Sequence, residues 1–207
     1  MAKAVENTEA QALCEAAHWC AARGWVPATS GNFSVRDVHA GCFVISRSGL
    51  DKGKMTTADL LVLDAAGHVV SGQGKPSAET ALHLVIYRDR PDANAILHVH
   101  TVWNTLIGTR FAGASHFRLT GYELLKALDG VATHEHRELV PVLANSQDYS
   151  ALSTQLAECL ADNPGAHGVL LSGHGLYTWG SSVSDARRHL EALEFLFEVE
   201  GRRIFGA

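Results

Sequence analysis

The order of apolar and polar residues along this chain predicts helices and strands in alternation. Short apolar runs bounded by turn residues, such as Cys42–Ser46 and Gly168–Ser172, predict strands. Stretches in which apolar residues recur at helical spacing predict helices, the last of them long enough to line a core with Leu190, Leu193 and Phe197. Helices are expected at about residues 8–23, 78–90, 150–161 and 184–204, with Ser77 as the cap of the second. A further helix is expected after His100, where Thr101 can cap it.

Further strands are predicted at about residues 33–36, 60–64, 69–71, 95–100, 139–143 and 176–179, with a short helical stretch near 120–128. Many of these strands follow one another through connections too short for parallel crossovers. We therefore expect an α/β fold, a single-domain α/β/α sandwich over residues 1–207 with a mainly antiparallel central sheet. No repeat, low-complexity tract or linker divides the chain.

Composition and charge narrow the class of protein. Of 207 residues, 46% are hydrophobic and 19% are charged, as in ordinary folded domains. The formal net charge of −5 disfavours a nucleic-acid partner, which requires clustered Lys and Arg. No apolar run approaches the roughly 20 residues that cross a bilayer, and the first residues lack the apolar core of a secretion signal. We expect a cytoplasmic protein without a membrane partner, whose four cysteines are reduced.

Three of the twelve histidines have the placement of a metal site. Side chains alternate along a strand, so His98 and His100 point the same way and can bind one ion. That pair alone is a weak indication, but His174 stands between two glycines directly after an apolar strand, where a turn can direct its ring into a cleft. Three neutral imidazoles suit Zn²⁺ and leave a coordination position for substrate, which is typical of catalytic sites.

Three turns contain residue types that bind anions. Each offers a hydroxyl group or a backbone N–H at a turn or a helix start, and Lys52 and Lys75 stand near in sequence to supply charge. Ser, Gly and Asn are ordinary turn residues, so one such turn means little. Together the turns Ser30–Asn32, Ser48–Gly49 and Ser77 predict a phosphate site, with Lys52 as a source of charge. Glu79 and Glu123 are candidate acid/base groups, although a surface glutamate is the more common interpretation of each.

These motifs stand in the order found in the class II aldolase/adducin family, which the chain resembles over most of its length. The resemblance implies that His98, His100 and His174 bind zinc, one ion per subunit. It implies that the substrate phosphate is surrounded by Gly31, Asn32, Ser48, Gly49 and Ser77. It also implies a small phosphorylated ketose as substrate and a homotetramer with active sites near the subunit interfaces. The stretches that carry it are Thr29–Asn32, Ser48–Gly49, Lys75–Glu79, His98–His100 and Ser172–Leu176.

Within the family, residues 48–53 and 117–123 are most similar to the branch that dehydrates 5-methylthioribulose 1-phosphate to 5-methylthio-2,3-dioxopentyl phosphate in methionine salvage. In that branch the glutamate matching Glu123 is the proposed general acid/base, whereas the aldolases use the one matching Glu79. This chain has both. The resemblance thus implies a lyase of the dehydratase type, with an aldolase acting on fuculose- or rhamnulose-like phosphates as the alternative. A non-catalytic module, as in the adducin branch, would lack the histidines.

The expected chemistry is common to both reactions. Chelation of the C2 carbonyl and C3 hydroxyl oxygens by the metal would make the C3 proton more acidic. In a dehydratase, Glu123 would remove that proton and then help the C4 hydroxyl group to leave as water. In an aldolase, the base would take the C4 hydroxyl proton instead, and the C3–C4 bond would break.

Overall fold

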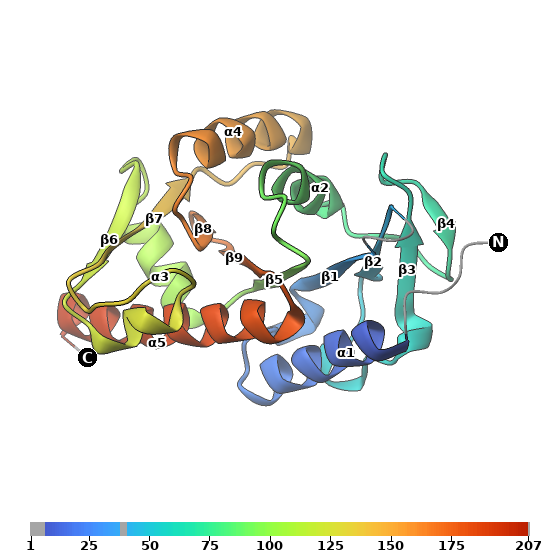
Figure 1. Cartoon of the computed structure of the whole chain (residues 1–207), viewed down its shortest axis with the longest axis horizontal. Helices are drawn as coiled ribbons and strands as arrows, with labels where there is room; N and C mark the ends of the chain where they lie inside the picture. The colour runs from blue at the N-terminus through green and yellow to red at the C-terminus, as the bar shows by residue number, and fades with distance from the viewer. Residues whose placement is uncertain (1–6, 38–40, 207) are drawn as a thin grey trace.

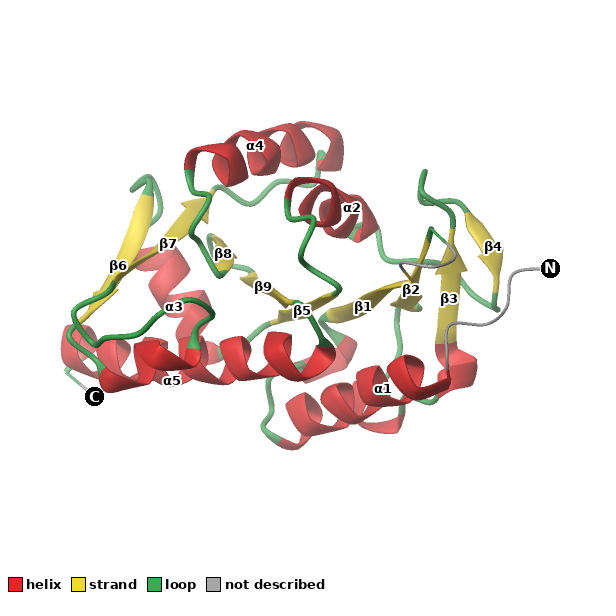
Figure 2. Ribbon diagram, viewed as in Figure 1, coloured by secondary structure: helices red, strands yellow, loops and turns green. Residues whose placement is uncertain are grey.

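Within residues 7–37 and 41–206, which the computed structural model describes, nine strands form one sheet (Figures 1 and 2). Their order across the sheet is β4-β3-β2-β1-β5-β9-β8-β7-β6. Neighbouring strands are antiparallel except for β7 and β8, which are parallel, so the mainly antiparallel sheet is confirmed. The strands are β1 Asn32–Asp37, β2 Cys42–Ser46, β3 Leu60–Leu63, β4 Val69–Ser71, β5 Ala95–Val99, β6 His116–Thr120, β7 Arg137–Leu143, β8 Gly168–Leu171 and β9 Gly175–Gly180.

Helices cover both faces of this sheet, which makes the α/β/α sandwich (Figure 1). Helices α2 and α4 pack against each other over one face, and α1, α3 and α5 lie over the other. No helix among the described residues is both long and apolar enough to span a bilayer. The helices are α1 Asn7–Ala22, α2 Thr80–Asp89, α3 Val102–Arg110, α4 Tyr149–Asp162 and α5 Val183–Phe205.

The central strand β5 divides its side chains between two cores. Leu97 and Val99 belong to the core beneath α1 and α5, whereas Ile96 belongs to the core beneath α2 and α4. Because side chains alternate along a strand, His98 points to the same side as Ile96. The ring of His98 stacks on Tyr177, which belongs to the core beneath α2 and α4, so the orientation that the alternation predicts is the one observed.

Two local predictions differ from the structure. The short helical stretch near 120–128 is confirmed in part, as the 3-10 helix η4 at Glu123–Ala127, but Thr120 ends strand β6, which was not predicted. In β6, Phe117 and Leu119 are buried and their neighbours are exposed, which is the period of a strand. Helix α2 begins at Thr80 with Glu79 at its N-cap, so Ser77 does not cap it. The Ser77 hydroxyl instead accepts a hydrogen bond from the Glu79 N–H at 3.2 Å and holds the turn before the helix.

Candidate metal centre

Three adjacent strands bring the histidines to one edge of the sheet. β5 lies between β1 and β9 and is antiparallel to both. The C-terminal end of β5 therefore meets the first residues of both neighbours. Asn32 of β1 pairs with His98, and His98 pairs with Tyr177 of β9. His100 directly follows β5 and His174 directly precedes β9, so residues distant along the chain meet here.

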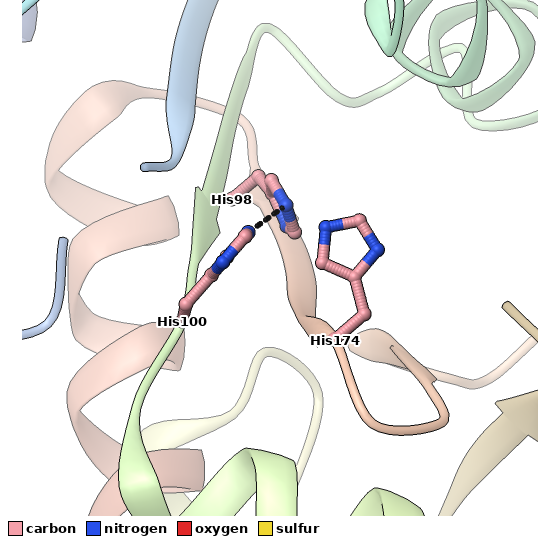
Figure 3. A group of neighbouring side chains, drawn as sticks. All are labelled: His98, His100 and His174. Atoms are coloured by element: carbon pink, nitrogen blue, oxygen red, sulfur yellow. Dashed lines mark hydrogen bonds between the residues drawn. The ribbon is translucent and has the colours of Figure 1, made fainter. Parts of the chain in front are cut away.

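The rings of His98, His100 and His174 face a common point (Figure 3). The distance between ring centroids is 4.6 Å for His98 and His100, 5.0 Å for His98 and His174, and 4.5 Å for His100 and His174. One nitrogen atom of each ring lies within 4.8 Å of the other two. The Nε2 atoms of His98 and His100 are 2.8 Å apart. The structure thus brings the three predicted ligands together.

Hydrogen bonds to the far side of two rings direct their Nε2 atoms to this point. Nδ1 of His98 lies 3.0 Å from the Leu176 carbonyl oxygen. A carbonyl can only accept, so Nδ1 carries the hydrogen and Nε2 keeps a lone pair. Nδ1 of His174 lies 3.1 Å from Oδ1 of Asn145. A carbonyl acceptor such as that of Leu176 fixes a metal-binding histidine in the right tautomer, and three imidazole nitrogens form a donor set that suits Zn²⁺.

The environment keeps two of the imidazoles neutral. His98 is completely buried, and its burial lowers the pKa of its ring far below the ordinary value. Burial, followed by the proximity of the His174 ring, lowers the pKa of His100 to about 4. A neutral imidazole is the form that binds a metal, so these two rings are ready to do so near neutral pH.

The two glycines beside His174 have different roles. Gly173 has a φ of +65°, which glycine adopts without the steric cost other residues incur. At Gly175 the constraint is space. A Cβ atom there would lie 2.4 Å from the Val99 carbonyl oxygen and 2.9 Å from a ring carbon of both His98 and His100. Only glycine allows the start of β9 to pass this close to the two rings.

Glu79 reaches the three histidines from the N-terminal end of α2. Its Oε1 lies 2.9 Å from Nε2 of His174, and its Oε2 lies 3.5 Å from Nε2 of His98. Oε2 also accepts a hydrogen bond of 2.6 Å from the Asn32 amide. Burial acts to raise the pKa of this carboxyl group, but the hydrogen bonds from His174 and from the Asn32 amide outweigh it and hold the pKa well below its usual range. The metal centre therefore has a carboxylate beside it.

Glu123 lies elsewhere on the chain, at the start of η4 between β6 and β7. Its side chain is 70% exposed and forms an ion pair with Lys126 and a second, at 3.8 Å, with His134. The hydrogen bond and charge of Lys126 lower the pKa of its carboxyl group. Within the described part of the chain, Glu123 makes no contact with the three histidines. A single chain thus brings together only one of the two candidate acid/base groups with the metal centre.

The three predicted phosphate turns meet one another beside the metal centre. Nζ of Lys52 donates hydrogen bonds to the carbonyl oxygens of Thr29, at 3.2 Å, and Leu50, at 3.0 Å, and so joins the first two turns. The Ser48 N–H donates to the Lys75 carbonyl at 2.8 Å, which joins the third. A Cβ atom on Gly31 would lie 2.6 Å from the His98 carbonyl oxygen, which places the first turn directly against β5.

Several of these groups already have partners inside the protein. The Asn32 amide, which we expected to face phosphate, donates to Glu79. Lys52 is 1% exposed, and its burial lowers the pKa of its ammonium group to about 8. Ser48 and Gly49 are exposed, and the buried hydroxyl of Ser30 has no hydrogen-bond partner among the described residues. The polar groups of these turns that remain open to a ligand are therefore fewer than the sequence indicated.

Two contacts of the metal centre were not predicted. Tyr177 stacks on His98 with 3.8 Å between ring centroids and 12° between ring planes. Asn145 follows the end of β7, and β7 is parallel to β8, so the segments leading to Asn145 and to His174 leave the sheet at the same edge. A polar residue just after an apolar strand was visible in the sequence, but the pairing that gives Asn145 its place was not.

Comparison with known proteins places these features in a family. Residues 11–200 match the model of the class II aldolase and adducin N-terminal domain. The chain is 49% identical over 196 residues to a protein named methylthioribulose-1-phosphate dehydratase from Methylococcus capsulatus, covering 95% of this chain and 94% of that one. It is 46% identical over 197 residues to a protein of the same name from Enterobacter sp. (strain 638), covering 95% and 96%. The structure is similar to that of the L-fuculose-1-phosphate aldolase from Thermus thermophilus, with a TM-score of 0.76, 26% identity and coverage of 97% and 99%.

Proposed function

Because this chain belongs to the class II aldolase and adducin family, we propose that it is a lyase that dehydrates 5-methylthioribulose 1-phosphate to 5-methylthio-2,3-dioxopentyl phosphate in methionine salvage. The relatives that carry the name of this dehydratase match over nearly the whole chain. The observation that carries the proposal is the convergence of three imidazoles beside a carboxylate, since a lyase of this family depends on a metal.

The metal of this proposal is Zn²⁺, one ion per subunit, held by His98, His100 and His174. A divalent metal bound there would supply Lewis acidity to the carbonyl and hydroxyl oxygens of the ketose. Leu176 and Asn145 hold two of the three rings with Nε2 directed to the centre. Phosphate is bound by the turns at Gly31, Ser48–Gly49 and Ser77, where Lys52 has a third N–H besides the two it donates to carbonyl oxygens.

Dehydration removes a proton from C3 and the hydroxyl group from C4. In our proposal Glu123 accepts the C3 proton and returns it to the departing hydroxyl group, so that water leaves and the carboxylate is regenerated. The remaining enol tautomerises to the 2,3-diketone. Glu123 is exposed on its own chain. In our proposal it therefore acts on the substrate bound at the metal centre of a neighbouring subunit in a homotetramer. Glu79, at the metal centre of the same chain, is the other carboxylate within reach of a bound ketose.

Product analysis tests the reaction. The purified enzyme is incubated with 5-methylthioribulose 1-phosphate, and the products are followed by ¹H and ³¹P NMR. The proposal predicts the diketone phosphate. Release of dihydroxyacetone phosphate would show aldol cleavage, the reaction named for the Thermus thermophilus protein. The absence of turnover, together with less than stoichiometric zinc, would favour a non-catalytic module.

Subunit mixing tests the shared active site. Glu123→Gln and His174→Ala variants are each expected to be inactive, for different reasons. In a mixed tetramer, an intact metal centre from the first variant can meet an intact Glu123 from the second. We expect co-expressed, doubly tagged tetramers to regain part of the wild-type activity. Mixed tetramers as inactive as their parents would show that both groups act within one chain.

We also propose a single domain and a cellular location. All strands described belong to one sheet, which supports a single domain over residues 1–207. A location in the cytoplasm is also proposed, and it rests on the metabolic role given above.

A further inference from the structure

A chain of buried hydrogen bonds leads from Glu79 into the interface between β1 and α2. Oε2 of Glu79 accepts from Nδ2 of Asn32 at 2.6 Å, and Oδ1 of Asn32 contacts Nε2 of His83. Nδ1 of His83 lies 2.7 Å from the Ser34 hydroxyl, which lies 2.8 Å from the Tyr87 hydroxyl. None of these five residues is more than 9% exposed. Water therefore has little access to the chain of bonds.

The chemistry of the groups fixes the direction of every bond. The amide nitrogen of Asn32 donates to the carboxylate, so its oxygen is the atom that faces His83. An amide oxygen only accepts, and Nε2 of His83 must therefore carry a hydrogen. In a neutral ring Nδ1 then has a lone pair and accepts from Ser34. The Ser34 hydroxyl has used its hydrogen, so Tyr87 donates to Ser34. Each donor points toward Glu79.

The surroundings of His83 favour the neutral ring that this direction requires. The side chain is 1% exposed, and its burial lowers the pKa of the ring to about 4, against the charge of Glu79. The edge of the ring packs against Tyr177, with 5.7 Å between centroids, and Tyr177 in turn stacks on His98. His83 is thus held by contacts on several sides, in a single orientation.

We propose that His83 is a positioning residue, which sets the orientation of the Asn32 amide and thereby holds the Glu79 carboxylate at the metal centre. If the amide of Asn32 turned over, its oxygen would face the carboxylate, and two acceptors would repel each other. The Nε2–H of His83 prevents this, because it would then meet the amide NH₂ group. Ser34 and Tyr87 keep that hydrogen on Nε2, since they supply a donor to Nδ1.

The orientation of Asn32 by His83 matters most when a metal is bound, and this step rests on the proposed function. In the structure, Glu79 has a second partner in Nε2 of His174. A ring nitrogen that binds a metal has no hydrogen to donate, so Glu79 then loses this partner. The Asn32 amide remains as a hydrogen-bond donor at 2.6 Å, beside the buried hydroxyl of Tyr177, which also interacts with the carboxylate. The place of Glu79 then depends more on the amide, and the amide depends on His83.

Kinetics of His83 variants test the proposal in the zinc-loaded enzyme. Loss of a residue that supports a metal site typically costs about 10- to 100-fold in activity. We expect His83→Leu to lower kcat by about that factor, with wild-type KM and zinc content. His83→Gln keeps an N–H near the place of Nε2, and we expect it to recover part of kcat. Wild-type kcat in His83→Leu, or equal losses in the two variants, would overturn the proposal.

Ile86→Ala is the matched control for stability. Ile86 is fully buried on the same helix and packs in the core between α2 and α4, and its apolar side chain takes no part in the chain of hydrogen bonds. This variant is expected to lower Tm at least as much as His83→Leu while it keeps kcat. If it loses as much activity as His83→Leu, the role of His83 is merely structural.

A measurement without substrate separates this proposal from the proposed function. In protein labelled with ¹⁵N-histidine, long-range ¹H–¹⁵N correlations distinguish a ring that carries its hydrogen on Nε2 from the other forms. We expect His83 to show the neutral Nε2–H form, and to keep it across the neutral pH range. A ring with the hydrogen on Nδ1, or an imidazolium, would overturn the proposed role of His83 even in an active enzyme. If the enzyme does not turn over the methylthio substrate, the proposed function fails, and this spectrum still decides whether His83 orients Asn32.

Discussion

Replacing Gly175 with alanine should damage metal binding more than it damages the fold. The new Cβ atom would lie 2.4 Å from the Val99 carbonyl oxygen and 2.9 Å from ring carbons of His98 and His100, whereas ordinary van der Waals contact begins at 3.4 Å. Relief requires a movement of about 0.5 Å for each ring and about 1 Å for the carbonyl group, by subtraction of these distances. A metal site tolerates displacements of only about 0.5 Å from its working geometry. We expect zinc affinity to fall at least about tenfold, or about 1.4 kcal/mol.

Gly173→Ala is the control on the other side of His174. The nearest atom to a Cβ there is Oγ1 of Thr109, at an ordinary 3.7 Å, but the φ of +65° costs an alanine roughly 1–2 kcal/mol. This variant should unfold at a lower temperature and still bind zinc as tightly as the wild type. Zinc affinity is measured by competition with a chromogenic chelator, and stability by thermal unfolding of the same samples. Wild-type zinc affinity in Gly175→Ala, or an equal loss in Gly173→Ala, would refute the reasoning.

Three other predictions concern charge and metal. Burial raises the pKa of Glu194 from 4.5 to about 7, against the hydrogen bonds from Thr101 and Asn104. The unfolded chain then loses this proton at lower pH than the native protein, so the free energy of unfolding falls as pH rises from 4.5 to 7. Glu194→Gln should remove about 3 kcal/mol of that fall. Urea unfolding in which the wild type and Glu194→Gln lose stability equally with pH would contradict this. Glu123→Gln should abolish turnover with zinc content intact, and retained activity would assign the acid/base role to Glu79 or to water. Removal of the metal by a chelator should abolish turnover and lower Tm, with recovery of both on addition of stoichiometric zinc; unchanged activity of metal-free protein would exclude the metal mechanism.

Local patterns predicted the elements that hold the metal centre. The run Cys42–Ser46 was predicted with the bounds that β2 has, because both its ends are marked by polar or turn residues. The alternation along β5 predicted the common orientation of His98 and His100. Thr101, expected to cap the next helix, accepts a hydrogen bond from the Asn104 N–H. Each of these features depends on interactions between residues close together in the sequence.

Features set by distant contacts could not be predicted in the same way. β6 alternates between buried and exposed residues for only five positions, too few to outweigh the helical residues that follow it. The order of strands, with β9 inserted between β5 and β8, comes from pairing across long stretches of chain. That order decides which residues surround His98. The sequence therefore predicted the three histidines but not Asn145 or Tyr177.

Asn32 shows why a residue type alone does not decide which groups a side chain contacts. Asparagine in a Ser-Gly-Asn turn is typical of phosphate sites, and the turn does lie beside the metal centre. Asn32, however, is also the first residue of β1 and pairs with His98. That register sends its amide to Glu79 rather than outward. The position in the sheet, and not the composition of the turn, decides what this side chain binds.

The surface of the chain gives a physical reason for the shared active site that we propose. Val102 begins α3, two residues after His100, and is 70% exposed. Leu124 follows Glu123 and is 37% exposed. An exposed apolar side chain thus lies beside the metal centre and another lies beside Glu123. Burial of such side chains between two copies of the chain favours association. A contact between copies that covered both would also carry the solvent-facing Glu123 carboxylate out of bulk water. Because exclusion of water strengthens the electrostatic interactions of a carboxylate, assembly and acid/base chemistry would depend on the same contact.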